Sequence, residues 1–114
     1  MIADDDPGIV DAIELMLTYE GYEVKTTSNG ATFSEVKKNH PDLVLLDIWM
    51  SGEDGREICR KIKATKQTKA IPVIIISASK DIERSAIDSG ADGFLEKPFE
   101  MNDLLDKIKS LLAT

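Results

Sequence analysis

Short apolar runs that stop abruptly at polar residues are the main pattern of this sequence. The clearest run spans residues 43–46, four aliphatic side chains followed at once by Asp47. Four apolar residues in a row are typical of a strand that is buried on both faces of a parallel sheet. Three more runs end in the same way, residues 1–3 at Asp4, 73–76 at Ser77, and 94–95 just before Glu96 and Lys97. We therefore expect several buried strands with a polar side chain at or just past each carboxyl end.

Helical patterns lie between these runs in the first half of the chain. Asp6 and Pro7 begin a helix, because aspartate is a favoured N-cap and proline is tolerated at the first helical position. This helix ends at Gly21, and its sheet-facing stripe is Ile9, Ile13, Met16 and Leu17. Residues 22–27 predict a second strand. A turn and a short helix follow, with the turn at Asn29 and Gly30, the apolar residues Phe33 and Val36, and a surface turn at His40 and Pro41.

The second half of the chain continues the alternation. Residues 51–55 are expected to form a loop with two glycines, and the next helix places Ile58 and Ile62 inward and Arg56, Arg60, Lys61 and Lys63 on a solvated face. A polar linker over residues 65–70 leads to the strand that ends at Ser77. A brief helix over residues 81–89 has Ile82, Ala86 and Ile87 on one side and is closed by Gly90. The last helix spans residues 101–112, with Leu104, Leu105, Ile108, Leu111 and Leu112 inward.

Five strands that alternate with five helices predict one α/β domain over residues 1–114. Such an order implies right-handed crossovers and a doubly wound parallel sheet with helices on both faces. Sheets of this kind bind ligands outside the carboxyl ends of their strands, so the polar strand ends should meet at one edge. The first strand has only three apolar residues, and we expect either that the native chain begins earlier or that this strand is unusually short.

Length and charge narrow the possible functions. A chain of 114 residues is long enough for one domain and too short for two. The net charge of -7 argues against direct nucleic-acid binding, which needs clustered Lys and Arg. No apolar run approaches the roughly 20 residues that span a bilayer, and no basic segment followed by an apolar one opens the chain, so we expect a cytoplasmic domain without membrane contact. The single Cys59 is interpreted as a small core residue.

Carboxylates dominate the candidate chemistry. Asp4, Asp5 and Asp6 follow one strand and Asp47 follows another, and like charges this close repel unless a cation neutralises them. Oxygen-only ligands suit a hard ion such as Mg²⁺, which keeps positions open for phosphate oxygens. Alone, Ser77 and Lys97 would be read as a strand-end hydroxyl and a solvated amine. Beside the acids, they predict a phosphate site and phosphoryl transfer onto a carboxylate.

Four segments together resemble the receiver domain of two-component response regulators. They are DDDP at residues 4–7, LVLLDIWMSGEDG at 43–55, PVIIISA at 72–78 and GADGFLEKPF at 90–99. Four motifs in order are a specific signal where one alone would be weak, and the resemblance covers essentially the whole chain. It implies a flavodoxin-like fold with a five-stranded parallel sheet in the order 2-1-3-4-5.

The resemblance also implies roles for single residues. Asp47 would be the phosphoacceptor, Ser77 the switch hydroxyl, Lys97 the phosphate-binding lysine and Phe94 the aromatic that changes rotamer. Asp5, Asp47 and the backbone carbonyl of Trp49 would bind Mg²⁺, with Asp4 acting nearby through water. The implied partners are a histidine kinase or a histidine phosphotransfer protein and a downstream effector. Such a domain is not an enzyme toward other substrates, because it catalyses only its own phosphorylation and dephosphorylation.

Three departures from the family pattern stand out. Ser51 replaces the usual proline, which predicts a looser loop after Asp47. Trp49 is bulky at a position that in receivers often influences how fast the phosphoryl group is lost. The stretch from residue 77 to 90 is about two residues shorter than expected for the family. This difference affects the expected fourth helix and its partner surface, and not the chemistry of the site.

Two other functional hypotheses remain at this point. The first is a haloacid-dehalogenase-like phosphatase, because residues 4–6 contain a D-x-D motif in which Asp4 would be the nucleophile. The chain is short for that class, without an evident substrate-covering cap or a Thr or Val after the motif. The second is a receiver fold used only for docking, in which the acids remain but phosphorylation plays no part.

Overall fold

The computed structural model of the chain describes residues 1–27, 31–50, 53–78 and 82–112. Its main sheet has five parallel strands in the order β2-β1-β3-β6-β7. The strands are β1 (Ile2–Ala3), β2 (Thr26–Thr27), β3 (Val44–Asp47), β6 (Val73–Ser77) and β7 (Gly93–Glu96). Counted along the chain within this sheet, the order is 2-1-3-4-5, so the predicted doubly wound fold is confirmed. The predicted turn at Asn29 and Gly30 lies outside the described residues.

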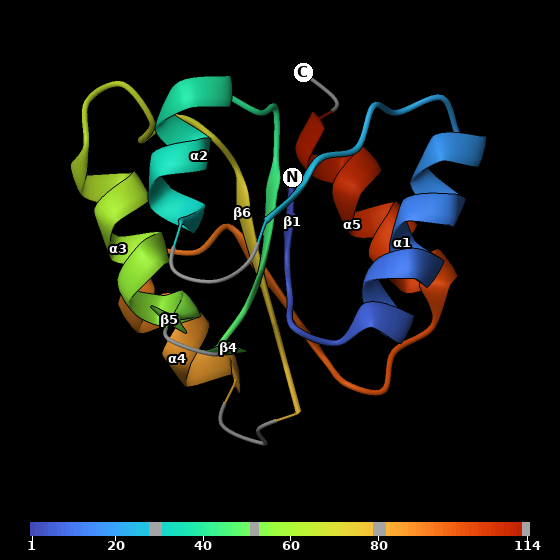
Figure 1. Ribbon diagram of the computed structural model, residues 1–114. Coiled ribbons are helices and arrows are strands. Elements are labelled where there is room, and N and C mark those ends of the chain that lie inside the picture. Colours follow the sequence, from blue (N-terminus) through green and yellow to red (C-terminus); the bar gives the residue numbers. More distant parts are fainter. Residues whose placement is uncertain (28–30, 51–52, 79–81, 113–114) are drawn as a thin grey trace.

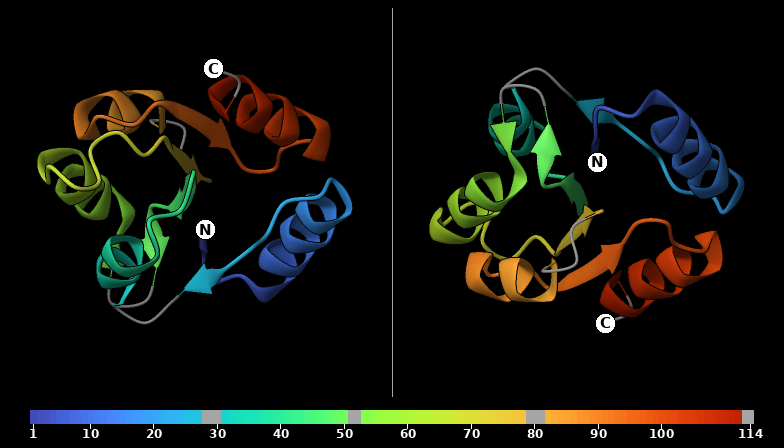
Figure 2. Two further views of the ribbon diagram at one scale, coloured as in Figure 1. Left: turned by 90° about the horizontal axis from the view of Figure 1, so that it is seen from above. Right: turned by 90° about the horizontal axis from the view of Figure 1, so that it is seen from below.

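Two layers of helices enclose the sheet (Figure 1). One layer consists of α1 (Pro7–Tyr19) and α5 (Met101–Leu112), and the other of α2 (Thr32–Asn39), α3 (Gly55–Ala64) and α4 (Ile82–Ser89). The views from above and below in Figure 2 show the sheet running between these layers. Among the described residues, no helix combines the length and apolar character that crossing a bilayer requires.

Alternating strand residues build a separate core on each face of the sheet. Val44 and Leu46 pack toward α2, α3 and α4, whereas Leu45 packs toward α1 and α5. The whole of β3 and β6 is buried, as expected for central strands covered on both faces. Cys59 is fully buried in the first of these cores, which confirms its interpretation as a core residue.

The local signals at the helix ends act as expected. Asp6 caps α1 by accepting hydrogen bonds from the amides of Gly8 and Ile9, 3.0 and 3.3 Å long. Gly21 and Gly90 follow α1 and α4 with φ of 93° and 85°, a left-handed conformation that glycine adopts without strain.

The segment after Asp47 corrects one expectation. In place of a loop over residues 51–55, the chain forms a small antiparallel hairpin of β4 (Trp49–Met50) and β5 (Glu53–Asp54), and Gly55 already belongs to α3. Ser51 itself lies outside the described residues. Alternation of side chains over two-residue strands is too short to be recognised in a sequence.

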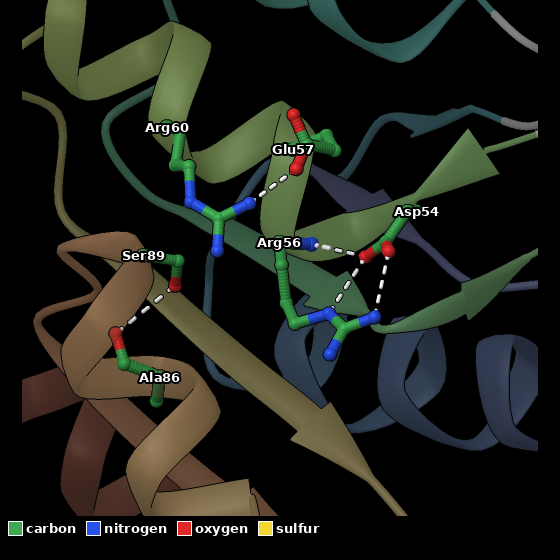
Figure 3. Close-up of polar contacts among 6 residues, drawn as sticks. All are labelled: Asp54, Arg56, Glu57, Arg60, Ala86 and Ser89. Atoms are coloured by element: carbon green, nitrogen blue, oxygen red, sulfur yellow. Dashed lines mark hydrogen bonds and ion pairs between the residues drawn. The ribbon is translucent and has the colours of Figure 1, made fainter.

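Three further expectations are wrong in detail. The strand predicted over residues 22–27 is limited to Thr26–Thr27, because β1 offers only two residues for pairing. Ile87 of α4 is 67% exposed, and Ser89 is buried instead, with its hydroxyl donating to the Ala86 carbonyl (Figure 3). Lys63 is not on a solvated face, since its ammonium donates to the Ile71 carbonyl at 2.8 Å and pairs with Asp92 at 2.7 Å.

We expect Gly55→Ala to destabilise the fold by roughly 1–3 kcal/mol, the usual effect of forcing an extra carbon into a packed region. A Cβ at Gly55 would lie 2.1 Å from the carbonyl oxygen of Asp47. The same backbone is fixed by the hydrogen bond from the Gly55 amide to the Ile48 carbonyl, 2.9 Å long. The loss is measured by urea denaturation.

Gly8→Ala is the matched control. A Cβ at Gly8 would make an ordinary contact of 3.4 Å with Asp6 Oδ1, and alanine favours a helix over glycine. Stability should therefore stay the same or rise slightly. Equal losses in the two variants would refute the steric explanation for Gly55.

Candidate functional site

Parallel pairing brings four strand ends to one edge of the sheet. Asp47 closes β3 opposite Ile76, and Ser77 closes β6 opposite Glu96. Asp4 follows β1 directly and Lys97 follows β7 directly. The amide of Lys97 donates to the Ser77 carbonyl at 2.8 Å, which extends the β6–β7 pairing to the site. Asp4, Asp47, Ser77 and Lys97 therefore occupy neighbouring strand ends.

An ammonium group between two buried carboxylates forms the centre of this edge. Lys97 Nζ lies 3.0 Å from Asp4 Oδ2 and 3.4 Å from Asp47 Oδ2. Asp4 is 5% exposed and Asp47 7%. The contact to Asp4 is short enough for an ion pair but is not aligned as a hydrogen bond, so Asp4 Oδ2 is a buried oxygen without a hydrogen-bond donor among the described residues. One cation thus faces two anions.

Burial and mutual repulsion shift the protonation equilibria of this group. Burial raises the pKa of Asp47, the negative charge of Asp4 raises it further, and Lys97 only partly offsets both effects. Burial alone lowers the pKa of the Lys97 ammonium, but the two carboxylates outweigh it, so that its pKa lies above the ordinary value. The site therefore stabilises positive charge and disfavours a second ionised carboxylate.

The hairpin after Asp47 folds back onto the phosphoacceptor candidate. The backbone amide of Trp49 lowers the pKa of the Asp47 carboxylate, against the larger effect of burial. The Trp49 side chain is 64% exposed. At the other end of the hairpin, Gly55 lies against the Asp47 backbone. Residues on both sides of the hairpin thus hold Asp47 in place.

The remaining predicted residues are placed differently. Asp5 is exposed at the rim, and Ser77 is fully buried at the end of β6. Phe94 is half-buried on β7 and packs against the core beneath α2, α3 and α4, with Lys107 Nζ of α5 5.7 Å from the centre of its ring. The structure therefore brings Asp4, Asp47 and Lys97 into contact and leaves Phe94 outside that group.

The oxygen-rich edge suits a hard cation with few protein ligands. In the part of the chain that the structure describes, no three Asp, Glu, His or Cys side chains come together as a metal cluster. Mg²⁺ commonly uses one or two carboxylates and completes its shell with water and phosphate oxygens, so this does not conflict with the donor set. Asp4 Oδ2 is in an ion pair with Lys97 and has no aligned hydrogen-bond donor among the described residues, so a cation-bound water could donate to it.

A hollow that is separate from this site lies at the opposite end of the sheet. It has a volume of about 850 Å³ and is lined by residues that include Val24, His40, Leu43 and Leu112. None of the predicted site residues lines it. Chemistry is better placed at the strand ends, where charged groups converge, than in this hollow.

Sequence reasoning missed two pairs of contacts around the hairpin. Glu53 accepts the amide and the hydroxyl of Thr32 at 3.2 and 2.7 Å, and thereby caps α2 from another element. Asp54 caps α3 and binds the guanidinium of Arg56. The Asp-Gly pair before an apolar helical stripe was a usable signal for the second cap, whereas nothing in the sequence links Glu53 to Thr32.

Comparison with known proteins bears on the functional hypotheses. The family model described as "Response regulator receiver domain" matches residues 1–109. The chain belongs to this family. The receiver domain thus takes part in phosphorylation-based two-component signalling, and family membership favours this over the phosphatase hypothesis for Asp4.

Relatives and solved structures agree with this assignment. The receiver domain is 33% identical to the DNA-binding dual master transcriptional regulator RpaA of Synechocystis, over 98% of this chain and 48% of the relative. It thus spans about half the length of the curated relatives it matches. A putative response regulator from Chloroflexus aurantiacus superposes with a TM-score of 0.91 at 33% identity, covering 99% and 95% of the two chains.

A second solved structure is similar at a lower identity, which shows likeness of fold alone. It is the receiver domain of sensor histidine kinase PA1611 from Pseudomonas aeruginosa, with a TM-score of 0.89 at 23% identity, covering 99% and 95% of the two chains. That structure has a magnesium ion coordinated in its active-site cleft.

In the metal-free protein, we expect Asp47→Asn to raise the free energy of unfolding at neutral pH. Because the folded state raises the pKa of Asp47, it binds this proton more tightly than the unfolded state does. Wild-type stability therefore falls as pH rises from the ordinary carboxyl pKa of 3.8 through the raised value, and asparagine removes this loss. Urea midpoints in the presence of a chelator, at acidic and neutral pH, measure the difference. A gain that grows toward acidic pH would contradict the assigned direction.

Proposed function

We propose that Asp47 is the residue that accepts the phosphoryl group. The observation that carries this proposal is the Lys97 ammonium, 3.4 Å from Asp47 and 3.0 Å from Asp4 at the carboxyl edge of the sheet. An incoming phosphoryl group brings negative oxygens, and a nearby fixed ammonium stabilises them by charge-assisted hydrogen bonds. Asp4 holds the ammonium in position from its other side.

The transfer is a nucleophilic displacement at phosphorus. A carboxylate oxygen of Asp47 forms the new P–O bond while the bond from phosphorus to the donor's leaving atom breaks, and the leaving group keeps that electron pair. The Trp49 amide favours the ionised form of the Asp47 carboxylate, because it lowers the pKa of this group. Lys97 supplies charge and transfers no proton.

Asp5, Asp47 and the Trp49 carbonyl are the groups that would hold Mg²⁺, with Asp4 reaching it through water. A bound Mg²⁺ would supply positive charge to the phosphoryl oxygens. The magnesium in the active-site cleft of the PA1611 receiver domain supports this expectation. Asp5 is the exposed member of the set and is therefore accessible to an ion from solvent.

The switch is proposed to run from Ser77 to Phe94. The Ser77 hydroxyl and Lys97 would bind the phosphoryl oxygens and draw the end of β6 toward Asp47. Phe94, half-buried one strand away, would then move inward into the space beside Ser77. A ligand shifts such an equilibrium only through contacts that differ between the two states, and these hydrogen bonds are such contacts.

The proposed setting is a cytoplasmic receiver domain over residues 1–114. Its phosphodonor is a histidine kinase or a histidine phosphotransfer protein, and its output passes to an effector through a surface other than a direct nucleic-acid contact. The surplus of acidic residues supports the last point. Beyond its own phosphorylation and dephosphorylation it carries out no catalysis.

We expect incubation with Mg²⁺ and acetyl phosphate to add one phosphoryl group, detected by mass spectrometry. Asp47→Asn should abolish the addition, because it removes the nucleophile. Asp5→Ala should slow it about tenfold or more, since a direct ligand is lost from a site that offers few side chains to the ion.

Two outcomes would lead to other hypotheses. A phosphoryl group that is still added to Asp47→Asn but not to Asp4→Asn would indicate that Asp4 is the nucleophile, as in the phosphatase hypothesis. A wild-type protein that takes no label from acetyl phosphate or from histidine kinases, yet binds a partner, would indicate a docking module.

We expect beryllofluoride, a phosphoryl mimic, to change amide NMR signals far from Asp47. The signals of Phe94, α4 and α5 should shift in the wild type and shift much less in Ser77→Ala, because the hydroxyl that couples the two strand ends is gone. Wild-type changes restricted to Asp4, Asp5 and Asp47, or undiminished shifts in Ser77→Ala, would refute this route.

A further inference from the structure

The position of Trp49 determines how the phosphoacceptor candidate is held. Trp49 follows Asp47 by two residues, its backbone amide lowers the pKa of the Asp47 carboxylate, and its carbonyl belongs to the proposed metal ligands. Trp49 begins the hairpin, and its direct cross-strand neighbour is Asp54. Any group that fixes the Trp49–Asp54 pair also fixes two backbone groups of the site.

Arg56 contacts both members of this pair. Its Nε and Nη2 donate to the two carboxylate oxygens of Asp54 at 3.0 and 2.8 Å, and its own amide donates to Asp54 Oδ1 at 2.9 Å (Figure 3). On its other side, the guanidinium carbon lies 5.0 Å from the centre of the Trp49 ring. The guanidinium thus connects the carboxylate to the indole.

These contacts restrict the orientation of the Arg56 guanidinium more than is usual for an arginine at the surface. A forked pair of hydrogen bonds fixes the plane of the guanidinium, and a cation over an indole face adds attraction. The side chain of Arg56 is 30% exposed, less than the 46% of Arg60 one turn later. Among the described residues, the ion pair of Arg60 is with Glu57 on the same helix (Figure 3), and it makes no hydrogen bond to the hairpin.

The hairpin needs such a restraint for two reasons. The two residues that separate its strands in the sequence are Ser51 and Gly52, and neither is a proline. Its strands are two residues long each, too short to be stable without other contacts. Glu53 is tied to Thr32 of α2, but that contact holds the strand opposite Met50 rather than Trp49.

We propose that Arg56 is a positioning residue for phosphorylation: through Asp54 and the Trp49 indole it fixes the Trp49 backbone that orients Asp47. The proposal rests on the proposed function of Asp47. Arg56 touches neither the phosphoryl group nor Asp47, and it acts entirely through Trp49. It replaces, with side-chain contacts, the stiffness that a proline in the turn would give.

The test compares Arg56→Ala with the matched control Arg60→Ala. The rate of phosphorylation by acetyl phosphate should fall roughly threefold to tenfold in Arg56→Ala, the range expected when one cation–π contact and one forked ion pair are lost. Arg60→Ala should retain the wild-type rate. Arg56→Lys, which keeps the charge but loses the fork, should lie between the wild type and Arg56→Ala.

The same substitution made in a Trp49→Leu protein distinguishes a positioning role of Arg56 from a general effect on stability. In Trp49→Leu, which has no ring for Arg56 to hold, adding Arg56→Ala should change the phosphorylation rate by less than twofold. An equal loss in both backgrounds, or equal losses in Arg56→Ala and Arg60→Ala, would overturn the proposal. Urea midpoints of all variants show whether any loss of rate only follows a loss of fold.

A spectroscopic readout keeps this test independent of the proposed function. Trp49 is the chain's single tryptophan, so fluorescence quenching by acrylamide reports on this ring alone. In the metal-free protein, Arg56→Ala should increase the quenching and shift the Trp49 amide NMR signal, and Arg60→Ala should do neither. If the wild type is never phosphorylated, the proposed function fails while this readout still decides whether Arg56 positions Trp49. An unchanged Trp49 amide in Arg56→Ala would refute the positioning role.

Discussion

The Lys97 ammonium between Asp4 and Asp47 is the interaction on which the site depends. Two carboxylates that are more than nine-tenths buried cannot both stay ionised at close range without a cation. Lys97 reaches both because only β3 and β6 lie between β7 and β1, and all these strands run in the same direction. The site is therefore a product of sheet topology as much as of its side chains. With both carboxylates ionised, the three groups carry an excess of one negative charge, which a further cation would offset.

The sequence was sufficient for the parts of the structure that follow from patterning. Uninterrupted apolar runs such as residues 43–46 identify buried parallel strands, and the Asp6-Pro7 pair and Gly21 identify the ends of a helix. Parallel strand ends must meet at one edge, so the proximity of Asp4, Asp47 and Lys97 could be predicted without coordinates. The hairpin, the burial of Ser89 in place of Ile87, and the contacts of Lys63 with the Ile71 carbonyl and Asp92 could not. Each depends on which neighbour fills a particular space, and periodicity carries no such information.

The segment around Asp47 and strand β7 with Phe94 differ in the contacts that hold them. Asp47 is surrounded by backbone contacts from Trp49 and Gly55, and the hairpin between them is tied to α2 by Glu53 and to α3 by Asp54. Phe94, in contrast, has a cation from α5 over its ring and the core of the opposite helical layer beneath it. The Asp47 side is thus held by several contacts, whereas Phe94 on β7 contacts groups from both helical layers. A fixed Asp47 beside a strand with contacts to both layers would suit the switch proposed above.

The short pairing of β1 with β2 has a consequence for how the domain opens. β3 and β6 pair over four buried residues, whereas β1 and β2 pair over two, and neither residue of β2 is fully buried. Local opening requires least free energy where the fewest buried contacts and ladder hydrogen bonds must break. β2 and the segment that joins it to α1 therefore form a cooperative unit of low stability at the edge of the sheet. This edge can fray and re-form many times during the lifetime of the β3–β6 ladder, so Asp47 remains in place while the edge is open.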